Sequence, residues 1–193
     1  VAVVNTKPGV VGAADLSFSY FNDDAHIGNT DGTYTFGMTI NNIGNKVSYS
    51  ELSRRDFIPM NLKIGNSFLA EFDEYNKVTF SLDLQRLLVP TPAIYKLIDG
   101  DFVMLAGMNG DVGIITSMMQ SFYDAPGVLA TDENGDYIQN TDGTYQVVKG
   151  TRLKEELAEI NIAAGAEWWY SDVLALRGGV FYENKNKGKS NIA

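Results

Sequence analysis

Thr33-Tyr34-Thr35-Phe36-Gly37-Met38-Thr39-Ile40 alternates at every step between a small or polar residue and a large apolar one. Successive side chains of an extended strand point to opposite faces, so this alternation gives the segment one apolar and one polar face. An amphipathic helix would instead bring its apolar residues back every three or four positions. The segment 33–41 therefore predicts a β-strand that is covered by apolar material on one face only.

Five more segments alternate in the same way, before and after this one. They span 12–21, 58–72, 76–87, 159–170 and 173–183. Most have at least the ~9–11 residues that a strand needs to cross a membrane. The sequence therefore predicts an all-β chain of antiparallel strands.

The connections between these segments indicate what kind of sheet they form. Tight turns around 73–75 and 171–172 join two pairs of segments, whereas the connections 42–57 and 88–158 are long. Short turns on one rim and long loops on the other are typical of an outer-membrane β-barrel. Soluble antiparallel sheets alternate as well, so a β-sandwich with an aromatic core remains the alternative.

Aromatic residues gather near the ends of the predicted strands, as they do in the girdles of membrane barrels. They are Tyr20, Phe21, Phe72, Tyr75, Trp168, Trp169, Tyr170, Phe181 and Tyr182. We therefore expect an antiparallel transmembrane β-barrel, with the apolar face toward outer-membrane lipid and the polar face toward the lumen.

Opposed residues of a tight hairpin share a face, which fixes the register across the two tight turns. That register sets Glu71 opposite Lys77 and Glu167 opposite Arg177. All four residues belong to the polar face of their strands. The sequence therefore predicts two lumen ion pairs, with a structural and not a catalytic role.

Composition excludes several classes of function. The chain carries 15 Lys and Arg against 24 Asp and Glu, a net charge of −9, which disfavours a nucleic-acid partner. It has no cysteine, and its one histidine, His26, lies in a predicted turn, so neither a thiol nor a His-dependent catalytic site is expected. There is no nucleophile elbow and no phosphate loop. We expect neither enzyme activity nor a cofactor.

Two polar turn motifs have simpler interpretations than a metal site. Asp132, Asn134 and Asp136 have the initial spacing of a calcium loop, but Tyr137 and Gly143 stand where such a loop needs glycine and glutamate. We expect no metal there. The string Asn-Thr-Asp-Gly-Thr-Tyr occurs at 29–34 and again at 140–145. Because Asp-Gly favours hairpin turns, both copies are predicted to be turns.

The connection 88–158 is far longer than an ordinary loop, and such loops usually carry function. Its part 101–123 is apolar and holds four of the six methionines, a residue type that adapts to varied partners. We predict partner contacts for these methionines and the aromatic turn after them, namely Met104, Met108, Met118, Met119, Phe122, Tyr123 and Pro126. The alternative is that these side chains fill the barrel mouth.

Some local structure is predicted within this connection. Leu153, Leu157 and Ile160 are spaced as one face of a short helix near 152–160. The stretch 137–148 predicts a small hairpin. The sequence leaves the role of the insertion at 128–150 open.

Several stretches, taken together, resemble the PorV family of the Bacteroidota type IX secretion system. In the first half they are Phe36-Gly37-Met38-Thr39-Ile40-Asn41-Asn42-Ile43-Gly44, Phe57-Ile58-Pro59-Met60-Asn61-Leu62-Lys63-Ile64-Gly65, Phe72-Asp73-Glu74-Tyr75-Asn76 and Leu87-Leu88-Val89-Pro90-Thr91-Pro92. In the second half they are Ser121-Phe122-Tyr123-Asp124-Ala125-Pro126-Gly127, Ala166-Glu167-Trp168-Trp169-Tyr170 and Phe181-Tyr182-Glu183-Asn184-Lys185. They follow in order over most of 12–187.

The resemblance implies a FadL-like outer-membrane barrel of fourteen strands, with 88–158 as one long extracellular loop. It implies three protein partners: the SprA translocon, secreted cargo with C-terminal sorting domains, and the attachment complex that contains PorU. Six strands cannot close such a barrel, so we expect 1–193 to be a single barrel domain present as a fragment. A FadL-like channel for hydrophobic small molecules is the alternative function.

Overall fold

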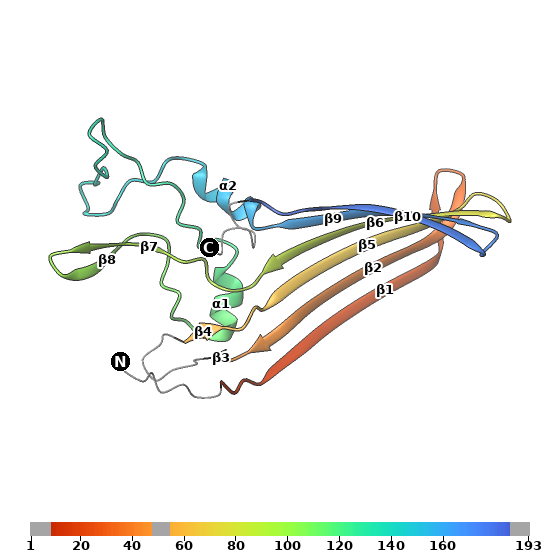
Figure 1. Cartoon of the computed structure of the whole chain (residues 1–193), viewed down its shortest axis with the longest axis horizontal. Helices are drawn as coiled ribbons and strands as arrows, with labels where there is room; N and C mark the ends of the chain where they lie inside the picture. The colour runs from red at the N-terminus through yellow and green to blue at the C-terminus, as the bar shows by residue number, and fades with distance from the viewer. Residues whose placement is uncertain (1–8, 48–54, 186–193) are drawn as a thin grey trace, which may run out of the picture. The chain divides into compact units, whose positions relative to one another are not determined.

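The alternating segments pair side by side into one antiparallel sheet, shown in Figure 1. The computed structural model describes residues 9–47 and 55–185. The chain divides into two compact units. Within the described residues, the sheet unit consists of 13–43, 61–86 and 160–185, and the loop unit consists of 9–12, 44–47, 55–60 and 87–159.

The sheet contains six strands in the order β1-β2-β5-β6-β9-β10. They are β1 (Ala13–Ile27), β2 (Thr30–Gly44), β5 (Asn61–Glu71), β6 (Asn76–Leu87), β9 (Asn161–Tyr170) and β10 (Leu174–Tyr182). All six predicted strands are therefore confirmed. Strands β1 and β10 form the two edges and do not pair with each other, so the described sheet is not closed into a barrel.

The predicted register of the last hairpin is also confirmed. Leu174 lies opposite Tyr170, and Arg177 lies opposite Glu167. Ser171 and Asp172, in the turn, adopt left-handed backbone conformations with φ of 51° and 55°. In the hairpin before it, the Phe72 N–H donates to the Asn76 carbonyl at 3.0 Å, as the predicted register requires.

The first hairpin differs from its prediction. The turn between β1 and β2 is Gly28 and Asn29, and Gly28 has a φ of 63° that favours glycine. Asp31 and Gly32, predicted as turn residues, instead lie within β2. The earlier Gly provides the positive φ, so the Asp-Gly pair is free to continue the strand. His26 likewise lies in β1, where its Nδ1 is 2.8 Å from Asp31 Oδ1.

The loop unit holds the remaining elements. They are β3 (Lys46–Val47), β4 (Asp56–Phe57), β7 (Ile94–Ile98), β8 (Asp101–Ala106), α1 (Ile114–Gln120) and α2 (Thr151–Ala158). Strands β3 and β4 pair with each other, as do β7 and β8. The short helix predicted near 152–160 is confirmed as α2. Neither described helix is long and apolar enough to cross a membrane.

The small apolar core of the loop unit lies where β8 meets the arm 128–148. Its buried members are Leu105, Ala106 and Leu129, and Ile94, Tyr145 and Val147 pack around them. The predicted hairpin at 137–148 forms at its turn, where the Asn140 N–H donates to the Thr144 carbonyl at 2.7 Å.

Candidate functional site

Helix α1 of the loop unit is amphipathic with its faces reversed. Ile115 and Met119 are spaced i and i+4, so they lie on one face of α1, and Phe122 follows in the turn after the helix; the three are 69%, 63% and 47% exposed. Tyr123, which follows Phe122, is 59% exposed. We call these four residues the α1 stripe. The opposite face holds Ser117, Gln120 and Ser121, which are fully or almost fully buried.

Hydrogen bonds hold this polar face in place. Ser117 Oγ donates to the Leu88 carbonyl at 3.2 Å, and Gln120 Nε2 donates to the Asn109 carbonyl at 3.0 Å. The Ser121 hydroxyl donates to the Met118 carbonyl at 2.8 Å. Because buried polar groups need partners, these bonds explain how a polar face can be buried at all. The bonds to Leu88 and Asn109 also fix the orientation of α1, because their acceptors lie outside the helix.

A buried carboxylate, Asp124, follows the polar face of α1. We call Ser117, Gln120, Ser121 and Asp124, together with Glu156 of α2 (Thr151–Ala158), the polar layer. It is 1% exposed, and its Oδ2 accepts from the Thr91 N–H at 3.0 Å and from Gln120 Nε2 at 3.3 Å. Its Oδ1 is buried and accepts no hydrogen bond within the described part of the chain. Burial raises the pKa of Asp124; the hydrogen bonds from Thr91 and Gln120 oppose that rise, and the charge of Glu156 adds to it.

Helix α2 also buries a polar side chain and exposes apolar ones. Glu156 is 7% exposed and accepts from the Ala125 N–H at 2.7 Å, while Leu153 and Leu157 are exposed. Glu155 accepts from the Gly127 N–H at 2.8 Å. The two helices thus turn polar side chains toward one polar layer and leave apolar side chains on the surface.

The predicted partner-contact residues occupy different positions. Met104, Met108, Met119, Phe122 and Tyr123 are exposed, Met118 is half-buried, and Pro126 is buried. Pro126 follows the buried residues Asp124 and Ala125, so it belongs to the packed turn and has little surface to offer a partner. Partner contact remains a prediction for the exposed members.

Sequence reasoning found only Met104 of a second exposed apolar surface in the loop unit. In the β7–β8 hairpin, Leu97 lies opposite Phe102 and Tyr95 lies opposite Met104, so the four side chains share one face. All four are exposed, Phe102 most of all at 78%. The Asp99-Gly100 turn, where both residues have positive φ, was the sequence signal that could have found this hairpin.

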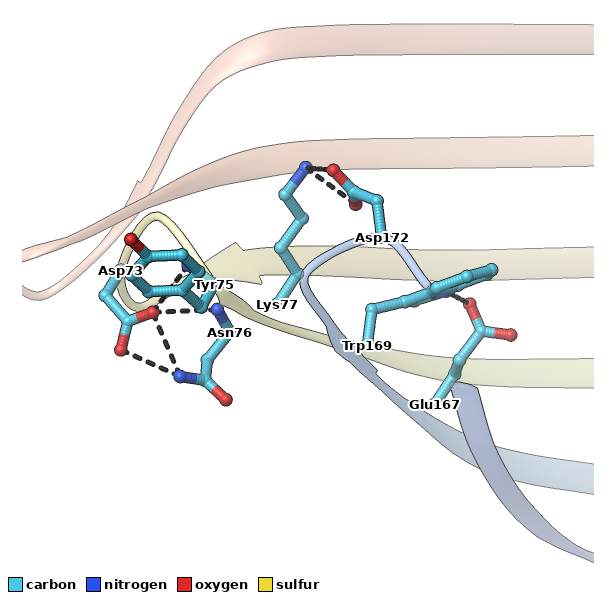
Figure 2. Close-up of polar contacts among 7 residues, drawn as sticks. All are labelled: Asp73, Tyr75, Asn76, Lys77, Glu167, Trp169 and Asp172. Carbon is cyan, nitrogen blue, oxygen red and sulfur yellow. Dashed lines mark hydrogen bonds and ion pairs between the residues drawn. The ribbon is translucent and has the colours of Figure 1, made fainter. Parts of the chain in front are cut away.

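At the short-turn end of the sheet unit, two hairpins contact each other, as Figure 2 shows. The Ser171 N–H of the β9–β10 turn donates to the Tyr75 carbonyl of the β5–β6 turn at 2.7 Å. Lys77 Nζ lies 3.2 Å from Asp172 Oδ1. Lys77 therefore forms its ion pair with the neighbouring hairpin and not with Glu71. Lys77 lies on β6, which has β5 on one side and β9 on the other, and its long side chain can reach either way.

The other predicted ion pair forms across its own hairpin. The Glu167 carboxylate contacts the Arg177 guanidinium, and it also accepts from the indole N–H of Trp169. The Arg177 guanidinium lies 5.5 Å from the centre of the Trp169 ring. That these groups face a lumen stays a prediction.

Asp73 shapes the β5–β6 turn. Its Oδ1 accepts from the backbone N–H groups of Tyr75 and Asn76, each at 2.8 Å, and Asn76 Nδ2 donates to both carboxylate oxygens (Figure 2). These bonds, led by the one from the Asn76 side chain, lower the pKa of Asp73. The ionised carboxylate therefore stabilises the turn.

We expect Asp73→Ala to lower the urea midpoint of unfolding, because two turn N–H groups lose their acceptor. Glu74→Ala, at the exposed neighbouring acid, is the matched control and should change little. The folded pKa of Asp73 is below its ordinary value of 3.8, so its stabilisation is full above that value and is lost as the pH falls through the folded pKa. The two variants should thus converge in acid, and equal midpoints at pH 7 would contradict this role.

The polar side of the sheet is hollowed. A groove of about 650 Å³ runs across the sheet, and all six strands contribute to it. Its polar and glycine lining includes Ser17, Thr35, Gly37, Thr39, Lys63, Gly65, Ser67, Ser81, Asp83, Gln85 and Asn161. Asp83 lies over Gly65, where a Cβ would be 2.5 Å from Asp83 Oδ1.

The motif at 132–136 is a turn. Asp132 Oδ1 accepts from the N–H groups of Asn134 and Asp136, each at 2.9 Å. Across residues 9–47 and 55–185, no three His, Asp or Glu side chains gather closely enough to hold a metal ion.

The comparison with known families gives a match in the first half of the chain. Residues 5–94 match the family model of type IX secretion system protein PorV. Over this stretch the chain belongs to the PorV family. That family is a secretion component of an outer-membrane system and is not an enzyme family. The matched stretch includes strands β1 to β6, whereas α1, α2, β9 and β10 lie beyond it. No curated protein matches the chain.

Proposed function

We propose that the protein is an outer-membrane component of type IX secretion that binds the SprA translocon. In this role it accepts or shuttles secreted cargo with C-terminal sorting domains toward the PorU-containing attachment complex. The observation that carries the proposal is membership of the PorV family over residues 5–94.

The sheet would form part of a FadL-like barrel of fourteen strands in the outer membrane. Two features support this. The alternating apolar face fits lipid, and the three short turns all join neighbouring strands while the long connections leave from the opposite strand ends. The Glu167–Arg177 pair and the polar groove would then face the lumen, and 88–158 would be an extracellular loop.

We assign partner contact to the exposed residues of that loop. Changing Met104, Met108, Met118 and Met119 together to Ser should reduce co-purification of the translocon or cargo roughly tenfold or more, since a few apolar residues usually carry most of the binding energy. The measurement is affinity capture from detergent-extracted membranes of the native host, quantified by mass spectrometry.

The matched control is Ile138→Ser with Val148→Ser, at two other exposed apolar positions of the same loop. Both proteins should insert into the membrane equally. Unchanged co-purification of the quadruple variant would remove the methionines from the contact, and absence of the translocon from the wild-type eluate would overturn the proposed function.

The alternative, a channel for hydrophobic small molecules, requires a continuous apolar pocket. The groove on the sheet is lined by polar side chains together with apolar ones, namely Phe18, Met38, Ile64, Leu84, Ala163 and Phe181. Fatty acid bound to a protein recovered alone would favour the channel.

A further inference from the structure

The loop unit has a groove of its own, of about 980 Å³. Two continuous segments line it, 103–107 at the end of β8 and 143–150 at the end of the arm 128–148. Ile98, Gln139, Asn140 and Arg152 complete the lining. We call this hollow the arm groove. Leu105 from one segment and Val147 from the other also belong to the apolar core of the loop unit, so the groove lies directly over that core.

The arm groove is lined by strand edges. Side chains of a strand alternate between two faces, so a groove lined by a face would include only every second residue. Here consecutive residues line it on both segments. Strand β8 pairs only with β7, and no backbone hydrogen bond joins β8 to 143–150 in the described part of the chain. The second edge of β8 therefore has unpaired backbone groups.

The arm offers backbone groups as well. The Ala130 N–H donates to the Gln146 carbonyl at 2.8 Å. The Val148 N–H donates to the Val128 carbonyl, also at 2.8 Å. In an antiparallel ladder, the residue between two such bonds directs its own N–H and C=O to the opposite side. Val147 is that residue, so its N–H and C=O point away from its partner strand in the arm.

The charge of the lining is the reverse of the charge of the segment around it. The segment 88–159 contains eleven acidic residues and four basic ones. The arm groove is lined by two of the four basic residues, Lys149 and Arg152, and by none of the acidic ones. Both basic side chains are exposed, and neither forms an ion pair within residues 9–47 and 55–185.

The acids nearest in sequence to the lining are engaged within the loop unit. The Asp142 carboxylate accepts from the Thr144 N–H at 2.9 Å and from the Thr144 hydroxyl at 2.6 Å. The Glu155 carboxylate accepts from the Gly127 N–H at 2.8 Å. Neither acid lines the groove, so the two basic residues are the charges that an occupant meets.

The basic end of the groove is the one next to the turn that contains Pro126 and Gly127. A Cβ on Gly127 would lie 2.9 Å from Arg152 Cγ, and a Cβ on Gly107 would lie 3.4 Å from Pro126 Cβ. Asp101 is at the other end of β8, about 20 Å away along a strand that rises about 3.3 Å per residue. Salt screens charges over about 8 Å, so Asp101 does not cancel the basic end.

We propose that the arm groove binds an extended, acidic segment of a partner protein. The segment lies along the exposed strand edges, forms main-chain hydrogen bonds with them, and pairs its carboxylates with Lys149 and Arg152. Anionic lipid and acidic polysaccharide also carry negative charge, but neither has a backbone that can pair with a strand edge. The inference goes beyond the proposed function, because the family match over 5–94 does not reach the lining of this groove.

Fluorescence anisotropy with the full chain in detergent tests the charge requirement. The probe is a labelled peptide of three Val-Thr repeats followed by two glutamates. Lys149→Gln with Arg152→Gln should weaken its binding about tenfold, because the carboxylates lose both partners. The matched control is Lys96→Gln with Lys154→Gln, which removes the other two basic residues of 88–159 from exposed positions outside the lining. The control should bind within about twofold of the wild type.

Changes to the peptide test the binding mode. Replacing its two glutamates with glutamine should weaken binding about as much as the groove variant does. Methylating the backbone nitrogen of each valine removes donors to the strand edges and should also weaken binding several-fold. An N-methylated peptide that binds as tightly as the parent overturns the strand pairing, and a glutamine peptide that does so overturns the charge pairing.

Two competitors test the class of ligand. Phosphatidylglycerol vesicles and polygalacturonate, each at the same carboxylate or phosphate concentration as the unlabelled peptide, should displace the probe less well than that peptide does. Equal or better displacement by either assigns the groove to lipid or to polysaccharide and overturns the inference. Absence of saturable binding of the peptide below about 1 mM overturns it as well.

Two further measurements keep these outcomes clear. Hydrogen exchange of the arm 128–148 should be the same in the groove variant, the control and the wild type, so that a loss of binding is not a loss of folding. The binding assay contains no secretion protein, so its failure leaves the proposed function standing. Absence of the translocon from the wild-type eluate, in turn, leaves the peptide site standing.

Discussion

Gly32→Ala is expected to destabilise the sheet by about 1–3 kcal/mol, the usual cost of forcing an extra methyl group into a packed position. A Cβ at Gly32 would lie 2.0 Å from the Leu69 carbonyl oxygen and 2.7 Å from Phe68 Cζ. The phenyl ring can rotate away, but the carbonyl belongs to the backbone of β5, which pairs with β2 along this stretch. Relief therefore requires the two strands to separate locally.

Gly37→Ala is the matched control, because it lies on the same strand and a Cβ there meets nothing within 4 Å. Urea unfolding of both variants in the same detergent measures the difference. Gly32→Ala should have the lower midpoint, and Gly37→Ala should stay close to the wild type. Equal midpoints would show that β2 and β5 are not packed as closely at Gly32 as the structure has them.

Substitution of Asp124 is expected to give the second large effect on stability. The size of this effect depends on which residue replaces the aspartate. Asp124→Ala removes the acceptor of the buried Thr91 N–H, which costs about 1–3 kcal/mol. Asp124→Asn keeps a side-chain oxygen for that N–H and carries no charge. We therefore expect the Ala variant to loosen the segments 88–92 and 120–127, and the Asn variant to keep them protected. Hydrogen exchange of these segments, read by mass spectrometry, is the measurement.

The comparison of wild type with Asp124→Asn should depend on pH. The folded pKa of Asp124 is raised above its ordinary value of 3.8, chiefly by burial. A raised folded pKa gives stability that is full below the ordinary value and is lost as the pH rises through the folded pKa. The wild type should therefore be at least as stable as the Asn variant in acid, and it should become less stable than the Asn variant toward neutral pH. A difference that does not change with pH would contradict the burial of this carboxyl.

The strands of the sheet could be predicted from the sequence because a period of two is a local property. The β9–β10 register followed as well, since a tight turn and the alternation together leave one pairing. The repeated string at 29–34 and 140–145 shows where local evidence stops. The second copy forms a turn at Asn140–Gly143, while the first lies mostly in β2, because Gly28 had already closed that hairpin.

The candidate site was harder to predict, although part of its signal was present. The spacing of Ile115, Met119 and Phe122 fits one helix face, but it reads as a buried face by the usual rule that apolar residues point inward. The reversal is set by Ser117, Gln120 and Asp124, whose partners lie at Leu88, Thr91 and Asn109. These hydrogen bonds join residues far apart in the sequence, so no local sequence pattern predicts them. Only the structure shows that the polar face of α1 is the buried one.

The direct pairing of β6 with β9 has a consequence for how such chains can diverge. Gln85 lies opposite Asn161, so the chain leaves the sheet at the end of β6 and returns to it on the adjacent strand β9. The segment between these two residues is therefore one long excursion from the sheet. The entropy of closing a loop grows only with the logarithm of its length, and doubling the length costs about 0.6 kcal/mol. Relatives can thus lengthen, shorten or replace this excursion at small cost to the sheet, which leaves partner choice free to evolve while the scaffold stays the same.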